Sequence, residues 1–276
     1  MITADFHTHT SFSTDSKSSP ESMIESAIAR GLKTYCITDH MDYFFPEHND
    51  KGFTEFVFDP DLYFETLTAL RSKYRGKIDL RIGIELGLRD EPDVREKNKA
   101  LCDALINSYP FDFVIGSTHV IAHFDPYYRE RWNGRSAEEI VRMYFESILY
   151  SVRHYDCFHV YGHLDYILRY VPDGAALDMA QYDELIDTIL KELIARGKGI
   201  EVNTGWLIKG GPSVNPSRAI LEKYYAFGGR IITIGSDSHI PERIGGRFDD
   251  AVKLLKEIGF KEYSVFRKGK ESRRKL

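Results

Sequence analysis

Seven strongly apolar runs recur along the chain, each with the length and the β-branched or aromatic content of a strand. They are too apolar to have one face in water, which is typical of parallel strands buried on both faces. Segments with helical periodicity separate them, so the order of elements predicts a parallel sheet covered by helices. The runs comprise residues 2–9, 33–40, 78–87, 111–120, 157–165, 197–205 and 229–239.

The helical segments carry recognisable end signals. Ser136 opens a Ser-Ala-Glu-Glu capping box, and Gly259 follows an amphipathic segment whose apolar residues share one face. Elsewhere a cap residue precedes proline at the first helical position, or a glycine ends the segment. The expected helices cover residues 20–31, 60–76, 137–155, 178–197, a segment after Pro216, and 248–259.

The positions of the polar residues favour a barrel over an open sheet. In all seven runs they gather at the C-terminal end, the face on which barrel enzymes build their sites, whereas an open sheet concentrates them at one crevice. A chain of 276 residues can form one such domain. The sequence therefore predicts a single seven-stranded (β/α) barrel domain over residues 1–276.

Composition narrows the class of protein. The 37 Lys and Arg residues against 42 Asp and Glu residues give a formal charge of −5, which argues against general attraction to nucleic acid or membranes. Neither a membrane-spanning apolar stretch nor a signal-peptide pattern is present. Cys36, Cys102 and Cys157 form no C-x-x-C pair, so we interpret them as reduced thiols of a cytoplasmic protein.

Potential metal ligands occur at six of the seven strand ends. His7 and His9 share one side of their strand, and so do Asp237 and His239, because side chains two residues apart point the same way. Unrelated core histidines would not all choose one end of a barrel. The complete candidate set is His7, His9, Asp15, His40, Glu85, His119, His163, Asp237 and His239.

This set offers nitrogen and carboxylate ligands without thiolate, which suits zinc, manganese or iron. A zinc ion with an open position uses three protein ligands, so nine candidates match three divalent ions, with Glu85 as a bridge. Three ions bring six positive charges, and three carboxylates with a bridging hydroxide offset four. The remaining charge of about +2 would be balanced by a phosphate monoester dianion.

The other histidines have simpler expectations. His159 should lie deep in the core and be hydrogen-bonded, because it precedes His163 by four strand residues. His154 ends a helix at the surface, and His48 lies in a polar loop. His123, just beyond His119, either touches substrate or belongs to the exposed loop.

The series of motifs resembles the PHP family, named for polymerase and histidinol phosphatase. The motifs are DFHTHT, TDH, the glutamate of GIELG, GSTH, GHLD and GSDSH, and they span nearly the whole chain. Members have a distorted seven-stranded (β/α) barrel, so the resemblance implies that fold. GHLDYILRY and EVNTGWLIKGG are similar to segments of the monofunctional histidinol-phosphate phosphatases. The resemblance therefore implies hydrolysis of L-histidinol phosphate, a step of histidine biosynthesis.

The resemblance also implies a trinuclear ligand assignment. His7, His9, Glu85 and Asp237 would hold the first ion; Glu85, His119 and His163 the second; and Asp15, His40 and His239 the third. An aspartate at position 15 resembles the histidinol-phosphatase branch, since some relatives have histidine there. Residues 206–209, Trp-Leu-Ile-Lys, depart from the Gly-Leu-Arg-Lys of many relatives.

For the reaction, we expect a hydroxide that bridges two ions to attack phosphorus, with the metal-binding residues Glu85, Asp237 and His239 forming the catalytic centre. The fixed cations expected at the phosphate are Arg169, just beyond GHLD, with Lys209 and Arg135 as weaker candidates. The aromatic loops 41–58 and 122–135 either cap the site or pack on the barrel rim. The basic end, residues 267–276, is expected to be a solvated terminus.

Three alternatives remain open at the level of sequence. A PHP phosphoesterase acting on nucleotides or single-stranded DNA would be expected to have a basic groove. An amidohydrolase barrel also begins with His-x-His, but it calls for eight strands and usually a bridging lysine. A metal-binding accessory protein would be expected to have lost at least one ligand position, and none is lost here. The sequence does not indicate the oligomeric state.

Overall fold

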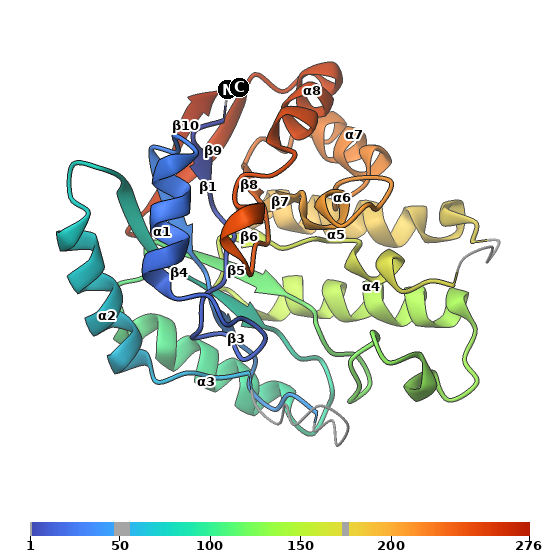
Figure 1. Cartoon of the computed structure of the whole chain (residues 1–276). Helices are drawn as coiled ribbons and strands as arrows, with labels where there is room; N and C mark the ends of the chain where they lie inside the picture. Colours follow the sequence, from blue (N-terminus) through green and yellow to red (C-terminus); the bar gives the residue numbers. More distant parts are fainter. Residues whose placement is uncertain (1, 47–55, 173–176) are drawn as a thin grey trace.

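The structure is a computed structural model that describes residues 2–46, 56–172 and 177–276 (Figure 1). Its centre is a parallel sheet in the order β1-β2-β4-β5-β6-β7-β8, which confirms the predicted barrel of seven strands. The short β3 pairs with β4 and continues the line of β2. The strands are β1 (Ala4–Asp5), β2 (Thr34–Ile37), β3 (His40–Met41), β4 (Asp79–Gly87), β5 (Phe113–Ser117), β6 (Val160–Tyr161), β7 (Gly199–Asn203) and β8 (Ile232–Gly235).

Backbone hydrogen bonds join the first and last strand segments. The Phe6 N–H donates to the Ile234 carbonyl at 3.0 Å, and the His9 N–H donates to the Ser238 carbonyl at 2.9 Å. The Asp237 N–H donates in the other direction, to the His7 carbonyl at 2.8 Å. The sheet is therefore a near-closed barrel, and the segment after β1 lies beside the end of β8 and the residues that follow it.

Helices cover the outside of the sheet (Figure 1). They are α1 (Pro20–Ala29), α2 (Pro60–Lys73), α3 (Arg95–Ser108), α4 (Ala137–His154), α5 (Asp183–Ala195), α6 (Gly205–Ile208), α7 (Arg218–Ala226) and α8 (Phe248–Ile258). The capping box at Ser136 is present, with reciprocal bonds to Glu139. Helix α5 starts later than expected, because a 3₁₀ turn over Met179–Tyr182 precedes it. None of the helices in the described part of the chain has the length and apolar character needed to span a membrane.

The basic terminus is exposed to solvent, as expected, but it is also an ordered strand, which was not predicted from the sequence. Residues Lys270–Lys275 form β10, an antiparallel partner of β9 (Glu262–Arg267). Lys268 and Gly269 link them with positive φ values of 49° and 71°, the backbone that a two-residue hairpin turn requires. The hairpin packs across the N-terminal ends of the barrel strands, where the Phe266 ring lies 5.1 Å from the Phe113 ring.

His159 lies at the same end of the barrel and is only partly buried, so the expectation of a deep core position was wrong. It is hydrogen-bonded as expected, because its Nδ1 accepts the Val114 N–H at 2.9 Å. His154 is exposed at the end of α4, as expected, and its Nδ1 lies 2.7 Å from the Tyr150 carbonyl oxygen. His48 lies outside the described residues, as does the part of loop 41–58 from 47 to 55.

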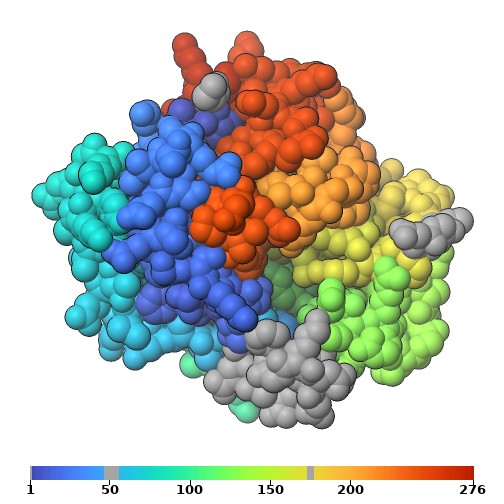
Figure 2. All heavy atoms as spheres, in the orientation of Figure 1, coloured from blue at the N-terminus to red at the C-terminus, as the bar shows by residue number. Residues whose placement is uncertain are grey.

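The opposite, C-terminal ends of the strands form the face that carries the histidines. The loop after β1 and the segment after β8 pack together there, since the hydroxyls of Ser16 and Ser18 both donate to the His239 carbonyl, at 2.9 and 2.8 Å. In the space-filling view these are the blue and orange-red segments that lie against each other (Figure 2). This contact holds residues from the first and last strands at one site.

Candidate metal centre

His7 and His9 follow β1 and direct their imidazoles toward the barrel axis, fully buried. Their Nε2 atoms lie 3.0 Å apart, and Nε2 of His7 lies 3.0 Å from Oε2 of Glu85. Burial lowers the pKa of His9 well below its ordinary value, and the nearby His239 and His40 lower it further. A metal ion binds the neutral form of an imidazole, so this environment suits a ligand.

Glu85, near the end of β4, lies between two groups of histidines. Its Oε1 is 3.0 Å from Nε2 of His163 and 3.2 Å from Nε2 of His119, while its Oε2 faces His7 and, at 3.2 Å, Nδ1 of His40. Burial opposes its charge, but His7, His119 and His40 outweigh burial and hold its pKa well below the usual range. A carboxylate with one oxygen toward each group has the geometry of a bridging ligand.

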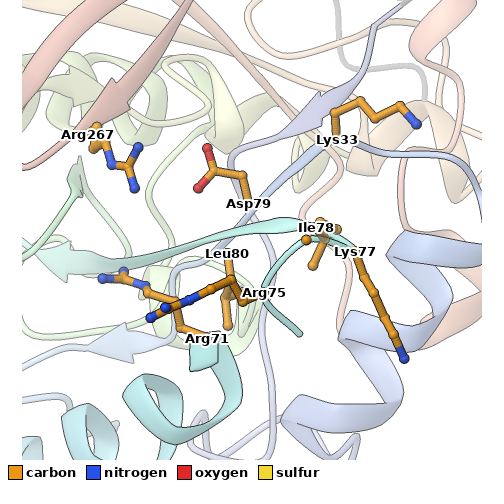
Figure 3. Close-up of a pocket in the computed structure, with 9 residues that line it drawn as sticks. Lys33, Arg71, Arg75, Lys77, Ile78, Asp79, Leu80 and Arg267 are labelled. Carbon is orange, nitrogen blue, oxygen red and sulfur yellow. The ribbon is translucent and has the colours of Figure 1, made fainter. Parts of the chain in front are cut away.

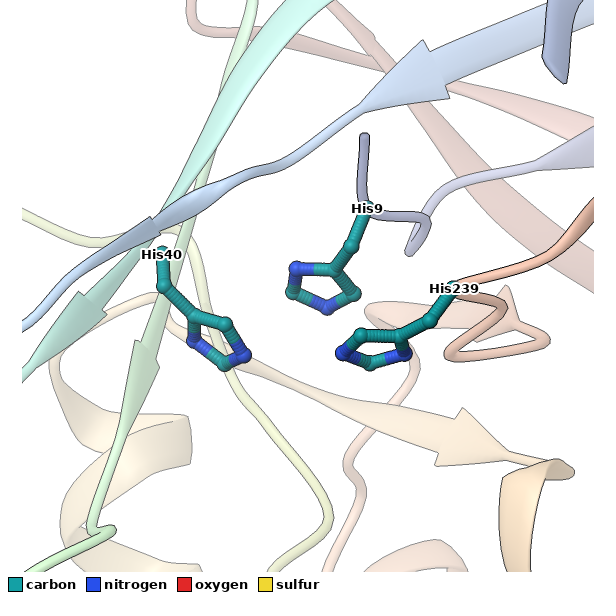
Figure 4. A group of neighbouring side chains, drawn as sticks. All are labelled: His9, His40 and His239. Carbon is teal, nitrogen blue, oxygen red and sulfur yellow. The ribbon is translucent and has the colours of Figure 1, made fainter. Parts of the chain in front are cut away.

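A third group forms around His40 and His239. The rings of these two histidines both stack on that of His9, with centroids 4.2 Å away in each case (Figure 4). Asp15 lies in the loop after β1, with Oδ2 3.1 Å from Nε2 of His239 and 3.9 Å from Nε2 of His40. Despite its burial, these histidines lower the pKa of Asp15.

Asp237 completes the arrangement from the β8 side. Its Oδ1 is 3.4 Å from Nε2 of His9 and 3.8 Å from Nε2 of His7. Asp237 has φ of +53° and His163 has φ of +21°, values that L-residues rarely adopt. Such strain persists where the surroundings over-determine a conformation, as they do at functional sites.

Two carboxylates that sequence reasoning had not identified orient the histidines from outside. Oε1 of Glu201, on β7, lies 2.6 Å from Nδ1 of His7, and Oδ1 of Asp42 lies 2.7 Å from Nδ1 of His119. Each contact leaves the Nε2 atom of its histidine turned toward Glu85. Carboxylate–histidine pairs of this kind fix the ring orientation in metal sites.

The donor chemistry fits divalent cations. Nδ1 of His40 and the Nε2 atoms of His119 and His239 are buried and have no hydrogen-bond partner among the described residues. Each of these atoms lies 3.1–3.2 Å from a carboxylate oxygen without the alignment of a hydrogen bond, an arrangement that a bound cation would satisfy. Four groups have ligand atoms within 4.8 Å of one another: His7-His9-Glu85, Glu85-His119-His163, His9-His40-His239 and His40-Asp42-His119.

A cavity of about 160 Å³ opens beside this cluster. Arg169 lines it, with Nε donating to Asn215 Oδ1 at 2.8 Å and Nη2 donating to Asn203 Oδ1 at 3.1 Å. Its Nη1 lies 3.6 Å from Oδ2 of Asp237. The lining residues are Asp15, His40, Asp42, Phe45, Phe56, His119, Asp125, His163, Tyr166, Arg169, Tyr170, Lys209, Asp237 and His239.

The structure therefore brings all nine predicted ligands together and adds Arg169 and Lys209 at the cavity. It places the other two predicted substrate contacts elsewhere. The His123 side chain is 53% exposed and its Nε2 lies 3.0 Å from Oδ1 of Asp93, so the exposed-loop alternative describes it. Arg135 is exposed and donates to the Trp132 carbonyl at 3.1 Å. Neither residue lines the cavity, although Asp125 of the same loop does.

A barrel with nitrogen and carboxylate donors at its C-terminal face defines a class of metal-binding proteins, and the comparison with known families agrees. The PHP domain model matches residues 5–205, and the chain belongs to the PHP domain family.

Within that family, the chain is similar to histidinol-phosphatases. It is 33% identical to the histidinol-phosphatase of Lactococcus lactis over 268 residues, covering 96% of this chain and 95% of the relative. It is 36% identical to a probable histidinol-phosphatase of Clostridium acetobutylicum over 259 residues, covering 93% and 94%. The crystal structure of the L. lactis histidinol phosphate phosphatase, complexed with zinc, L-histidinol and phosphate, superposes with a TM-score of 0.84. That match has 31% identity and covers 98% of both chains.

Proposed function

We propose that this chain is a histidinol-phosphatase, a hydrolase that converts L-histidinol phosphate to L-histidinol and phosphate. The observation that carries the proposal is the match over 98% of both chains to a phosphatase crystallised with zinc, L-histidinol and phosphate. The cavity beside the donor cluster supports it, because Arg169 and Lys209 line that cavity next to the candidate ligands.

We further propose that the site holds three divalent ions. The ligands of the first are His7, His9, Glu85 and Asp237, and those of the second are Glu85, His119 and His163. Asp15, His40 and His239 hold the third. Such ions supply a nucleophilic water at neutral pH and positive charge for the phosphoryl oxygens. The shared carboxylate of Glu85 fixes the spacing between the first two.

The protein's own side chains would position the ester. The Arg169 guanidinium is held in place by Asn215 and Asn203, and Asp237 raises its pKa despite burial, so it stays charged and preorganised for phosphate. Tyr166 lies under that guanidinium, with the ring centroid 4.9 Å from Cζ. Aromatic rings and the Asp125 carboxylate line the same cavity, and they suit an imidazole-bearing alcohol with a cationic amine.

The experiment that tests this function is a substrate comparison. The protein is purified without chelators, its metal content is measured, and turnover of L-histidinol phosphate is compared with that of an aryl phosphate and single-stranded DNA. We expect histidinol phosphate to be strongly preferred. Equal rates on the aryl ester would refute the substrate, and preference for DNA would support the nucleic-acid alternative.

A variant at the proposed bridge tests the metal arrangement. Glu85→Gln keeps the shape of the side chain but removes its charge, so two ions lose a ligand at once. Activity should fall by more than about 100-fold, since outer partners of metal ligands alone are worth 10- to 100-fold. Metal content should fall with it. Retention of most activity would show that Glu85 is not the bridge, and fewer than two tightly held ions in the wild type would contradict the arrangement itself.

A further inference from the structure

A second hollow lies at the opposite end of the barrel, at the N-terminal ends of the strands. Its volume is about 630 Å³, and its lining includes the end of α2, the start of β4 and the last residue of β9. Asp79 of β4 borders it, and Glu85, six residues further along β4, lies at the metal centre roughly 20 Å away. The hollow is therefore separate from the catalytic cavity.

The charged residues of this hollow are mostly basic. Lys33, Arg71, Arg75, Lys77 and Arg267 line it, with Asp79 as the single acidic lining residue. Two carboxylates are already engaged, since Asp112 pairs with Arg71 and Asp79 pairs with Arg81. The five lining cations and Arg81 make six positive charges, and Asp79 and Asp112 offset two of them. The region therefore has four excess positive charges, in a chain whose formal charge is −5.

Four of the lining cations have no carboxylate partner within the described parts of the chain: Lys33, Arg75, Lys77 and Arg267. All four are exposed and come from three segments that the fold brings together: Lys33 before β2, Arg75 and Lys77 between α2 and β4, and Arg267 at the end of β9. The side chains of Arg71, Arg75 and Arg267 extend to the same side of the hollow, beside Asp79, while Lys33 and Lys77 border it from the other side (Figure 3). Burial lowers the pKa of the neighbouring Arg81, and the positive charge of Arg267 lowers that pKa further. Holding these like charges together costs free energy that a bound anion would recover.

We infer that this hollow is a binding site for a small molecule that carries a diphosphate or longer phosphate chain. Guanidinium groups contact phosphate oxygens in a bidentate manner, and at least three of them lie along the hollow. A single phosphate dianion would neutralise only about half of the four excess charges, whereas a diphosphate or triphosphate carries about three or four negative charges. The volume also exceeds that of the catalytic cavity, which leaves room for a larger anion.

The test is calorimetric titration of the metal-loaded full-length protein with inorganic diphosphate. Arg75→Gln/Arg267→Gln removes two unpaired cations of the hollow, and Lys253→Gln/Lys256→Gln removes two exposed cations of α8 as the matched control. We expect wild type and control to give the same two binding components, one from the hollow and one from the metal centre. The hollow variant should keep the metal-centre component, while its hollow component weakens at least ten-fold. Metal content is measured before and after each titration, because the metal centre is common to all three proteins and must stay the same.

Two further probes give the test its alternatives. Inorganic monophosphate should bind the wild-type hollow at least ten-fold more weakly than diphosphate, and equal affinity would overturn the assignment to a phosphate chain. A single-stranded oligonucleotide should not displace diphosphate from the hollow of the wild-type protein. Competition by the oligonucleotide, or equal losses in both double variants, would show a non-specific basic surface. Unchanged thermal midpoints of the unliganded proteins establish that the variants are folded.

Discussion

Nδ1 of His7 lies 2.6 Å from Oε1 of Glu201, and this contact joins the segment after β1 to β7, the sixth strand of the barrel, through side chains 194 residues apart. The same carboxylate accepts the backbone N–H of His163 through Oε2 at 3.0 Å. Glu201 therefore positions two of the candidate metal ligands while lying outside the ligand set itself.

The first prediction follows from this contact. Glu201→Gln keeps the shape of the side chain but replaces the charged acceptor of His7 with a neutral amide, so the His7 imidazole becomes a weaker and less well oriented ligand. Metal affinity or kcat should fall by about 10- to 100-fold, the usual effect of removing a carboxylate behind a ligating histidine. Metal content per chain and steady-state kinetics on L-histidinol phosphate measure both.

Glu262→Gln, at an exposed position on β9, is the matched control and should behave as wild type. A Glu201→Gln protein with wild-type metal content and wild-type kcat would show that the contact is only structural.

The candidate ligand set was accessible from the sequence, because parallel strands bring their C-terminal ends to one face wherever they occur in the chain. His7 and Asp237 could thus be grouped without knowing any distance. Glu201 was missed because it lies within the one strand whose end carried no assigned ligand. Its signal was nevertheless present: a glutamate inside an apolar, fully buried strand needs a charged partner.

Helix α3 and strand β10 were not predicted from the sequence, and both omissions have a physical explanation. Helix α3 buries only Asn98, Cys102 and Leu105, and Val94 at its start provides no side-chain cap. Neither an apolar stripe nor an end signal therefore marks it in the sequence. In β10 the apolar pattern is also absent, since the strand is held by pairing with β9 and by Arg274, which donates to Thr34 Oγ1 at 2.8 Å.

The second prediction concerns Arg169. Arg169→Lys keeps a positive charge but loses the planar fork that Asn215 and Asn203 hold, so a phosphate would meet a mobile point charge. We expect kcat/KM on L-histidinol phosphate to fall by about ten-fold or more, which corresponds to at least about 1.4 kcal/mol of transition-state stabilisation. Arg135→Lys, outside the cavity, is the control. Equal kinetics for the two variants would remove Arg169 from the phosphate site.

The third prediction concerns Gly235, at the end of β8. A Cβ atom there would lie 2.3 Å from Cβ of His7 and 2.4 Å from Oε1 of Glu201, so Gly235→Ala must displace the contact that orients His7. Unfolding in urea should show a loss of about 3 kcal/mol, at the upper end for overpacking, together with a large loss of activity.

Gly228→Ala separates this effect from backbone strain. Gly228 has φ of +92° and nothing within 4 Å of the added Cβ, so alanine there should cost only about 1–2 kcal/mol and leave activity intact. If Gly235→Ala is as stable and as active as Gly228→Ala, the close packing around His7 does not matter to the site.

The fourth prediction is a pH dependence that originates far from the metal centre. Burial, together with the smaller effect of the Lys198 charge, lowers the pKa of His159 to about 4, while its Nδ1 accepts the Val114 N–H and must stay unprotonated. Between pH 6.5 and 4 the unfolded chain takes up a proton at this residue that the folded protein does not. The contribution of His159 to the free energy of unfolding is therefore fully present above pH 6.5 and is lost as the pH falls toward 4. The loss between pH 7.5 and pH 5 is about 2 kcal/mol. Urea unfolding of wild type and His159→Gln at both pH values measures it as a difference of differences, which cancels the titration of the metal ligands common to both proteins. The variant should be less stable at pH 7.5 and should lose about 2 kcal/mol less on acidification; parallel losses in the two proteins would show that His159 is protonated in the folded state.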